Sequence, residues 1–414
     1  MTILALIIVT ALVLEFVLET AADILNLRSL RAKLPPALDG IYRTDEYRTS
    51  QEYARSRTRL GLMTRTLGLL ILFSFWFGHG FNYLDQIVRA WGFNPIVSGL
   101  FYFGILGAAY NLLTLPASIY ATFVIEERFG FNRTSVSTFI MDRLKGLALL
   151  VIIGSPLLAG ILWLFEYTAP YAWLWAWFAA VLFTVVLEFI SPIWIMPLFN
   201  RFTPMGPGEL KEAIQNYARS AGYNIGKIFV IDSSRRSAKT NAFFTGFGRS
   251  KRIALFDTLV DKHTVPELVA ILAHEIGHYK KKHVVTGMII GIAQAGLMFY
   301  LLSSFLGSDG LYRAFYLQSP SIYAGLVCFG FIYMPLEFVL SIALQALSRR
   351  NEYEADRFAA QTIVEPAELA NALRKLSASN LANLTPHPFY VFLNYSHPPL
   401  LERIQAIQRI TSKQ

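Results

Sequence analysis

Apolar residues gather in seven long stretches of the chain, and charged residues are scarce within them. A helix needs about 20 mostly apolar residues to cross a bilayer, and each stretch reaches that length. The pattern therefore predicts seven transmembrane helices, at 3–27, 66–88, 97–125, 146–167, 170–197, 284–306 and 320–347. The first stretch carries Glu15, Glu19 and Asp23 and has no basic residues before it, which is not the pattern of a cleaved signal peptide.

Composition agrees with a chain that lies largely in lipid. Of its 414 residues, 54% are hydrophobic and only 16% are charged. This leaves too few charges to cover the three soluble domains that the length alone would suggest. The one cysteine, Cys328, excludes a disulfide within the chain and a multi-cysteine metal site. We therefore predict a mainly α, polytopic membrane protein.

Basic residues are divided unequally between the two sides of the predicted bundle. Of the 37 lysines and arginines, all but Arg89 and Arg313 lie in the pieces that follow spans one, three, five and seven. Short basic loops mark the cytosolic side of a membrane. We expect an external N-terminus and a cytosolic C-terminus. The net charge of +9 then reflects orientation, and the expected partner is a lipid bilayer rather than nucleic acid.

Two polar segments, 201–282 and 348–414, are able to fold in water, and each is too small to bury much core alone. We expect them to pack as one cytosolic domain. The first segment predicts a helix at 209–221 and then strands at 227–232, 241–248 and 252–257, which together form a small sheet with a hairpin.

A zinc-binding pattern lies on a predicted helix at 264–282. Thr264 and Glu267 form a capping box at its start, and the sequence HEIGH places His274 and His278 four residues apart on one face. Two histidines so placed bind one zinc ion, and Glu275 beside them takes a proton from the metal-bound water. The alternative is a chance pattern on a solvated helix.

A catalytic zinc usually has three protein ligands, so a third ligand has to come from elsewhere. The helix expected after span seven contains the sequence NEYEAD. Glu352 and Asp356 share one face of it, whereas Glu354 points away from that face. One carboxylate would bind zinc and the other would orient a ligand histidine. The alternative is an ordinary solvated acidic helix.

Several motifs in order along the chain resemble the type I CAAX prenyl endopeptidases, which are integral membrane zinc metalloproteases related to the a-factor-converting enzyme. The motifs are EERFGFNRTSVSTFIMDRLKG (126–146), SAKTNAFFTGFG, HEIGH, NEYEAD and SHPPLLERI. The resemblance implies seven transmembrane helices that enclose a chamber, with a gluzincin-like cytosolic metalloprotease domain that contains a small β-sheet. It implies cleavage of prenylated CAAX-type peptides with one zinc ion as cofactor.

The resemblance also assigns roles to residues of this chain. His274, His278 and Glu352 would be the zinc ligands, Glu275 the general base and Asp356 the residue that orients a ligand. His397 would contact the substrate or the oxyanion, with a capping role before Pro398 as the alternative. Asn241 and Ala242 would start an edge strand that pairs with substrate, with a structural hairpin strand as the alternative. Apart from the resemblance, the position of Arg403 one turn after Pro398 and Pro399 suits a pair with a carboxylate near the site, with a plain surface salt bridge as the alternative.

We divide the chain into four parts. They are helices one to five with a basic cytosolic loop at 28–65 (1–200), a first metalloprotease part (201–282), helices six and seven (283–347) and a second metalloprotease part (348–414). We expect a monomer in a bacterial inner membrane, with the endoplasmic reticulum membrane as the alternative.

Other functions and other arrangements remain as alternatives. The chain would otherwise be a membrane quality-control metalloprotease without prenyl specificity, or a zinc-stabilised scaffold or transporter. Acidic residues inside the spans, among them Glu188 and Glu337, predict an interior that holds water, and direct bonding between packed helices is the alternative.

Overall fold

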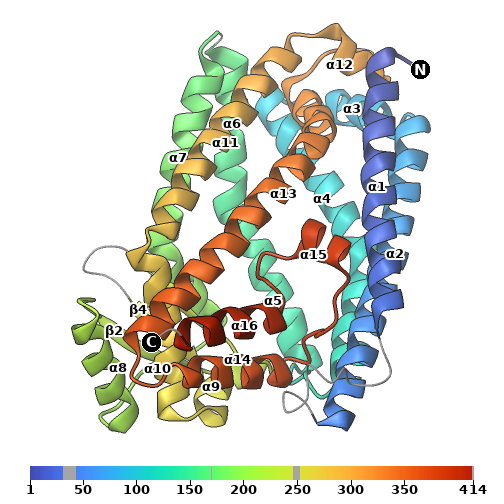
Figure 1. The fold of residues 1–414 in the computed structure, drawn as a ribbon. Helices are drawn as coiled ribbons and strands as arrows, with labels where there is room; N and C mark the ends of the chain where they lie inside the picture. The colour runs from blue at the N-terminus through green and yellow to red at the C-terminus, as the bar shows by residue number, and fades with distance from the viewer. Residues whose placement is uncertain (31–42, 169, 246–251, 413–414) are drawn as a thin grey trace.

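A helical bundle with a mixed α/β unit at one end makes up the computed structural model (Figure 1). The structure describes residues 1–30, 43–168, 170–245 and 252–412. The N-terminus lies at the end of the bundle away from the α/β unit, and the C-terminus lies within that unit. This arrangement agrees with an odd number of crossings.

Seven helical segments in the described part of the chain are long and apolar enough to cross a membrane, as the sequence predicts. Between 6% and 17% of the residues in their most apolar windows are buried, so most of these side chains face either lipid or an interior that protein does not fill. The segments are α1 (Ile3–Ser29), α2 (Thr44–Phe77), α4 with η2 (Pro95–Glu126), α5, η3 and α6 (Val136–Tyr167), α7 with η4 and η5 (Ala172–Leu198), α11 (His283–Leu306) and α13 (Ile322–Thr362).

The predicted second span, 66–88, is wrong in its second half. Helix α2 ends at Phe77, and a separate amphipathic helix, α3 (Gly80–Ala90), follows. His79 between them has φ 61°, a left-handed conformation that ends the first helix. Helix α3 buries Phe81, Leu84 and Val88 near α12 (Asp309–Ala314), at the end of the bundle away from the α/β unit. Apolar content alone does not reveal this turn.

The expected separation between span seven and the NEYEAD helix is also wrong. Helix α13 runs without a break for 41 residues, from the outer end of the bundle into the α/β unit. The sequence SRRNEYEAD contains no glycine or proline, so nothing ends the helix where it leaves the apolar region. One continuous helix therefore carries both the seventh span and the candidate zinc ligand Glu352. The second half of the basic loop at 28–65 is also helical, because α2 begins at Thr44.

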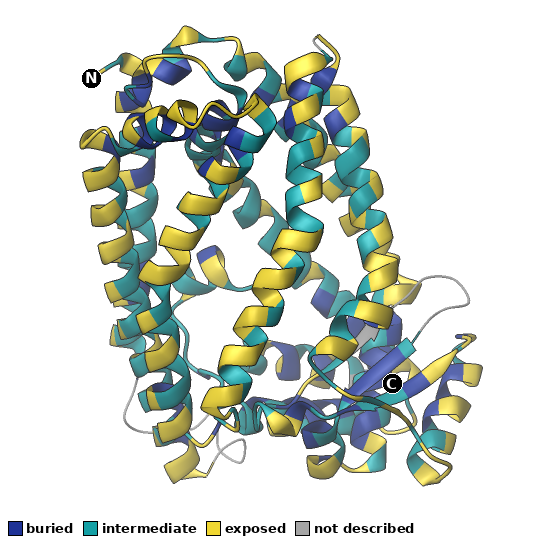
Figure 2. Cartoon of the chain, turned by 180° about the vertical axis from the view of Figure 1, so that it is seen from behind, coloured by how far each residue is buried: buried dark blue, intermediate teal, exposed yellow. Residues whose placement is uncertain are grey.

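Buried side chains concentrate at the two ends of the molecule (Figure 2). One core near the N-terminus includes Trp76, Tyr102 and Phe315, and a second core in the α/β unit includes Ile253, Leu272 and residues of other segments. The second core combines side chains from both polar segments, among them Ile214, Ile276, Ala359, Leu369 and Ile407. The two polar segments thus fold together, as predicted.

The acidic residues of the spans divide into two groups. Asp23 and Glu19 of α1 form ion pairs with Arg65 of α2, at 2.6 and 3.4 Å. These two carboxylates therefore match the alternative of direct bonding between packed helices. Glu188 and Glu337 are exposed, which agrees with an interior that holds water.

A four-stranded sheet in the described residues has the order β1-β2-β4-β3. The predicted strands are β2 (Lys227–Ile231), β3 (Ala242–Thr245) and β4 (Arg252–Phe256), and the pattern missed β1 (Phe202–Pro204). Strands β3 and β4 pair in antiparallel fashion, β2 and β4 in parallel, and β3 lies at the sheet edge. Residues 246–248 of the second predicted strand, 241–248, lie outside the described residues.

Five further α-helices of the described residues belong to the α/β unit. They are α8 (Glu209–Ser220), α9 (Asp257–Lys262), α10 (Val265–Lys280), α14 (Ala367–Ser379) and α16 (Leu400–Thr411). Helix α15 (Pro388–Asn394) lies between α1 and α13 (Figure 1).

Candidate metal centre

Helix α10 begins with the capping box that the sequence predicts. The backbone N–H of Thr264 donates to Oε2 of Glu267 at 2.8 Å, and the hydroxyl of Thr264 accepts from the N–H of Glu267. Lys375 of α14 forms a 2.8 Å ion pair with the same carboxylate, which is buried. Burial alone would raise the pKa of Glu267. The bonds from Lys375 and from the Thr264 N–H lower it by more than burial raises it, so the pKa lies below its ordinary value. These bonds among Thr264, Glu267 and Lys375 therefore hold the start of α10 in place.

Close packing of α10 on α13 brings the two parts of the candidate site together. A Cβ atom added at Gly277 would lie 3.0 Å from Cα and from the carbonyl oxygen of Ala355. A side chain at that distance would force the two helices apart, so the glycine of HEIGH permits the close crossing. His274 and His278 on α10 then face Glu352 on α13.

Three side chains in this crossing place their ligand atoms at the spacing of a zinc site. Nε2 of His274 and Nε2 of His278 are 3.2 Å apart, and Glu352 places Oε1 3.2 Å from His278 and Oε2 3.4 Å from His274. Ligand atoms about 2.0–2.1 Å from a tetrahedral zinc ion lie about 3.3–3.4 Å from one another. All ligand atoms of the group lie within 4.8 Å of each other. The donor set and its spacing therefore fit zinc.

Asp356 and Arg403 lie behind His274. Oδ1 of Asp356 lies 2.8 Å from Nδ1 of His274, and Arg403 donates two hydrogen bonds to the Asp356 carboxylate, at 2.7 and 2.8 Å. Arg403 also lies 3.2 Å from Oε2 of Glu352. Arg403 and Asp356 are both buried, so Arg403 is part of a buried network and the surface salt bridge is excluded. Burial lowers the pKa of His274, but Asp356 and Glu352 raise it to a net value of about 9.

Glu275 lies between the two histidines in sequence and shares their surroundings. Burial raises the pKa of its carboxyl group, and the neighbouring histidines oppose that effect. A carboxylate with a raised pKa is a better proton acceptor at neutral pH than an ordinary glutamate. The position suits a general base.

His397, in the loop between α15 and α16, lies beside the candidate ligand Glu352. Its Nε2 is 3.4 Å from Oε1 of Glu352, and its side chain is 63% exposed. Nδ1 of the same ring is 2.9 Å from the hydroxyl of Ser396. The ring can therefore meet a group that enters from solvent.

Asn241 and Ala242 lie at the start of the edge strand β3. The N–H of Phe256 in β4 donates to the carbonyl of Asn241 at 3.1 Å, so the backbone groups of Thr240 and Ala242 point to the free edge. The side chain of Asn380 bonds both groups of Thr240, accepting from its N–H at 3.0 Å and donating to its carbonyl at 3.1 Å. The N–H of Ala242 donates to the side chain of Asn241 at 2.8 Å.

Sequence reasoning missed two residues near these groups. His283 lies beside His278, and Asn380 holds the edge strand. The spacing of His283, five residues after His278, was a signal for the first. Nothing in the local sequence marks Asn380, because its partner lies 140 residues away.

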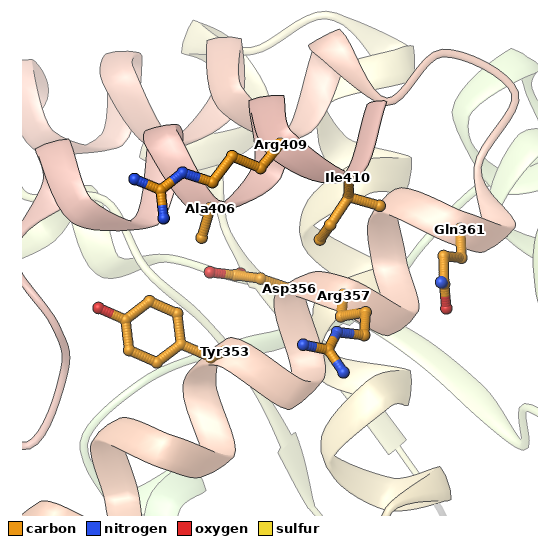
Figure 3. A pocket seen from close by; sticks show the side chains of 7 residues that line it. All are labelled: Tyr353, Asp356, Arg357, Gln361, Ala406, Arg409 and Ile410. Atoms are coloured by element: carbon orange, nitrogen blue, oxygen red, sulfur yellow. The ribbon is translucent and has the colours of Figure 1, made fainter. Parts of the chain in front are cut away.

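A cavity of about 720 Å³ is lined by Asp356 but by none of the three candidate ligands (Figure 3). Helices α13 and α16 form its walls. Arg357 and Arg409, which are both exposed, contribute to these walls. The candidate metal site is therefore recognised from its donor atoms, because this cavity does not include them.

Family models cover nearly the whole chain. Residues 23–201 match the CAAX prenyl protease N-terminal model of five membrane helices, and residues 205–411 match peptidase family M48. The chain belongs to the CAAX prenyl protease 1 family of M48 peptidases. It is therefore a multi-pass membrane zinc metalloendopeptidase, and the scaffold or transporter alternative falls away.

Members of the family from distant eukaryotes align along their full length. The chain is 33% identical to CAAX prenyl protease 1 homolog of Arabidopsis thaliana over 410 residues, covering 96% of this chain and 95% of the relative. It is 34% identical to CAAX prenyl protease 1 of Saccharomyces cerevisiae, covering 92% and 90%. The crystal structure of Ste24p from S. mikatae superposes with a TM-score of 0.93 at 31% identity, covering 98% and 99%. The fold of this relative therefore matches that of the chain along nearly its whole length.

Proposed function

We propose that the enzyme cleaves extended, prenylated CAAX-type peptides, with His274, His278 and Glu352 as the ligands of one zinc ion. The observation that carries the proposal is that the ligand atoms of these three side chains approach one another at 3.2–3.4 Å, with Glu275 beside them in sequence. Zinc in such a site supplies Lewis-acid chemistry that makes a bound water more acidic.

The side chains of this chain then have separate tasks. Glu275 takes the proton of the attacking water and returns it to the leaving amine. His397 donates a hydrogen bond to the developing oxyanion from the solvent side. Asp356 holds Nδ1 of His274, and Arg403 holds Asp356, so that Nε2 of His274 stays directed to the metal.

The edge strand β3 supplies the main-chain partner for the peptide. A substrate strand adds to a free sheet edge through backbone hydrogen bonds and needs little side-chain specificity. Because Asn380 occupies both backbone groups of Thr240, pairing begins at Ala242. The side chain of Asn241 covers the N–H of Ala242 and has to turn away when a peptide binds.

The sparse burial along the spans supports an interior chamber. Cores lie at the two ends of the bundle, whereas Glu188 and Glu337 between them are exposed. A chamber with both apolar and acidic walls accommodates a prenyl chain together with water. The four parts 1–200, 201–282, 283–347 and 348–414 then alternate between chamber wall and protease, and α13 joins the last two.

A panel of peptides tests substrate choice and strand pairing together. A farnesylated CAAX peptide is expected to be cleaved faster than its unprenylated twin, and a zinc chelator is expected to stop both reactions. Methylation of the backbone nitrogen that pairs with β3 is expected to lower kcat/KM about tenfold, the effect of one lost hydrogen bond at a buried partner.

Each outcome of the panel bears on a different claim. Equal rates for the prenylated and unprenylated peptides would remove lipid recognition and favour the quality-control protease. An unchanged rate for every N-methylated peptide would remove the edge strand from substrate binding. Cleavage that persists in the presence of the chelator would contradict the zinc site.

We further propose that the α/β unit lies on the cytosolic side and the N-terminus outside, in a monomer. A bacterial inner membrane is the proposed location, and the endoplasmic reticulum membrane is the alternative that the eukaryotic relatives favour. An impermeant thiol reagent added outside is expected to label Tyr83→Cys on α3. It is expected to label Glu365→Cys, which follows α13, only after the membrane is permeabilised. The reverse pattern would invert the topology.

A further inference from the structure

The two ligand histidines each turn Nε2 toward the candidate zinc position and Nδ1 toward another side chain. For His274 that side chain is Asp356, at 2.8 Å. For His278 it is His283, with the two Nδ1 atoms 3.1 Å apart. A zinc-binding histidine usually donates its second N–H to a partner that fixes the ring, and this bond affects metal affinity.

His283 is itself held on its other side. Its Nε2 lies 3.3 Å from Oε2 of Glu354 on α13, and Oε1 of Glu354 accepts from Nε of Arg350 at 3.2 Å. The sequence reasoning that placed Glu354 away from the ligand face is therefore correct, but this side chain still reaches the site through His283. The ring of His283 crosses that of His278 at 72°, with 5.1 Å between centroids.

The turn between α10 and α11 places His283 there. Lys282 has φ 60°, a left-handed conformation that is uncommon for a residue with a side chain. Helix α11 starts at the next residue, so the turn brings His283 back beside the last turn of α10. Strained residues of this kind persist where the surrounding contacts require them.

We infer that His283 and Glu354 form a positioning relay for the zinc ligand His278. One proton arrangement satisfies every atom of the relay: Nδ1–H of His278 donates to Nδ1 of His283, and Nε2–H of His283 donates to the carboxylate of Glu354. Nε2 of His278 is then free of hydrogen and directed to the metal. The relay rests on the proposed zinc site and extends it to residues that do not touch the metal.

Zinc affinity tests the relay without any substrate. His283→Phe keeps a ring of similar shape but cannot accept or donate, and it is expected to weaken zinc binding about 10- to 100-fold in competition with a chelator. Glu354→Gln is expected to weaken binding in the same direction by a smaller factor. The double variant is expected to bind no more weakly than His283→Phe, because both changes break one chain of bonds.

Three further measurements separate positioning from structure. His283→Gln offers both an acceptor and a donor and is expected to restore affinity to within a few fold of the parent. The cobalt-substituted His283→Phe variant is expected to keep the parental visible spectrum, since His283 is not a ligand. Lys281→Ala, an exposed change in the same turn, is expected to leave affinity unchanged.

Parental zinc affinity in both His283→Phe and Glu354→Gln would overturn the relay. If His283→Phe fails to fold, Glu354→Gln decides alone, because its side chain lies at the outer end of the relay. These measurements use no peptide, so their failure is distinguishable from failure of the proposed cleavage reaction.

Discussion

Glu275→Gln will abolish peptide cleavage while the protein still binds one zinc ion. Glutamine has the shape of glutamate but cannot accept a proton from water at neutral pH. The three ligand atoms belong to other side chains, so their spacing is expected to survive the change. Loss of a general base lowers the rate by about 10²- to 10⁴-fold. The measurements are kcat with the farnesylated peptide and the zinc content of the purified protein.

A matched control makes the Glu275 result specific. Glu365→Gln removes a carboxylate of the same kind at an exposed position after α13 and is expected to keep the parental rate. Cleavage by Glu275→Gln at the parental rate would refute the proposed role of Glu275. Loss of zinc together with loss of activity would instead assign Glu275 to the metal site.

Arg403→Met is expected to lower the free energy of unfolding by about 3–5 kcal/mol. Arg403 is buried and neutralises two buried carboxylates, with bonds of 2.7 and 2.8 Å to Asp356 and a 3.2 Å ion pair to Glu352. Removal of one partner from a buried charge network leaves the other charges uncompensated. Thermal and denaturant unfolding in detergent measure the loss.

Zinc and a lysine variant give the Arg403 prediction a finer test. Excess zinc is expected to reduce the difference in unfolding free energy between the parent and Arg403→Met without removing it. The metal neutralises Glu352 but not Asp356. Arg403→Lys keeps the charge but loses the two parallel bonds, so it is expected to fall between the parent and Arg403→Met. Arg409→Met, an exposed change on the same helix, is expected to stay within about 0.5 kcal/mol of the parent. Parental stability of Arg403→Met would exclude the buried network.

The predictable parts of the fold are those that local sequence encodes. Seven apolar stretches gave seven spans because burial in lipid requires length and apolarity, which are counted along the chain. The α10 capping box and the shared face of His274 and His278 follow from helical spacing within a few residues. The turn at His79 and the unbroken α13 escaped prediction because the spans were placed by apolar content, which does not mark where a helix begins or ends.

The candidate site divides in the same way. Its ligand types, and the separate faces of Glu352 and Glu354, were readable from i, i+4 spacing on single helices.

The tertiary structure decided which of these groups meet. Asp356 bonds Arg403 across 47 residues of sequence, and His283 contacts Glu354 across 71. Thr240 bonds Asn380 across 140 residues. Such contacts depend on where helices cross, and here the crossing depends on Gly277 against Ala355. The sequence alone determined the membrane class, the zinc motif and the chemistry of each side chain. Only the packed fold decided which distant side chains hold the ligands in place. Residue spacing places side chains within one helix, whereas these contacts form where two elements pack against each other.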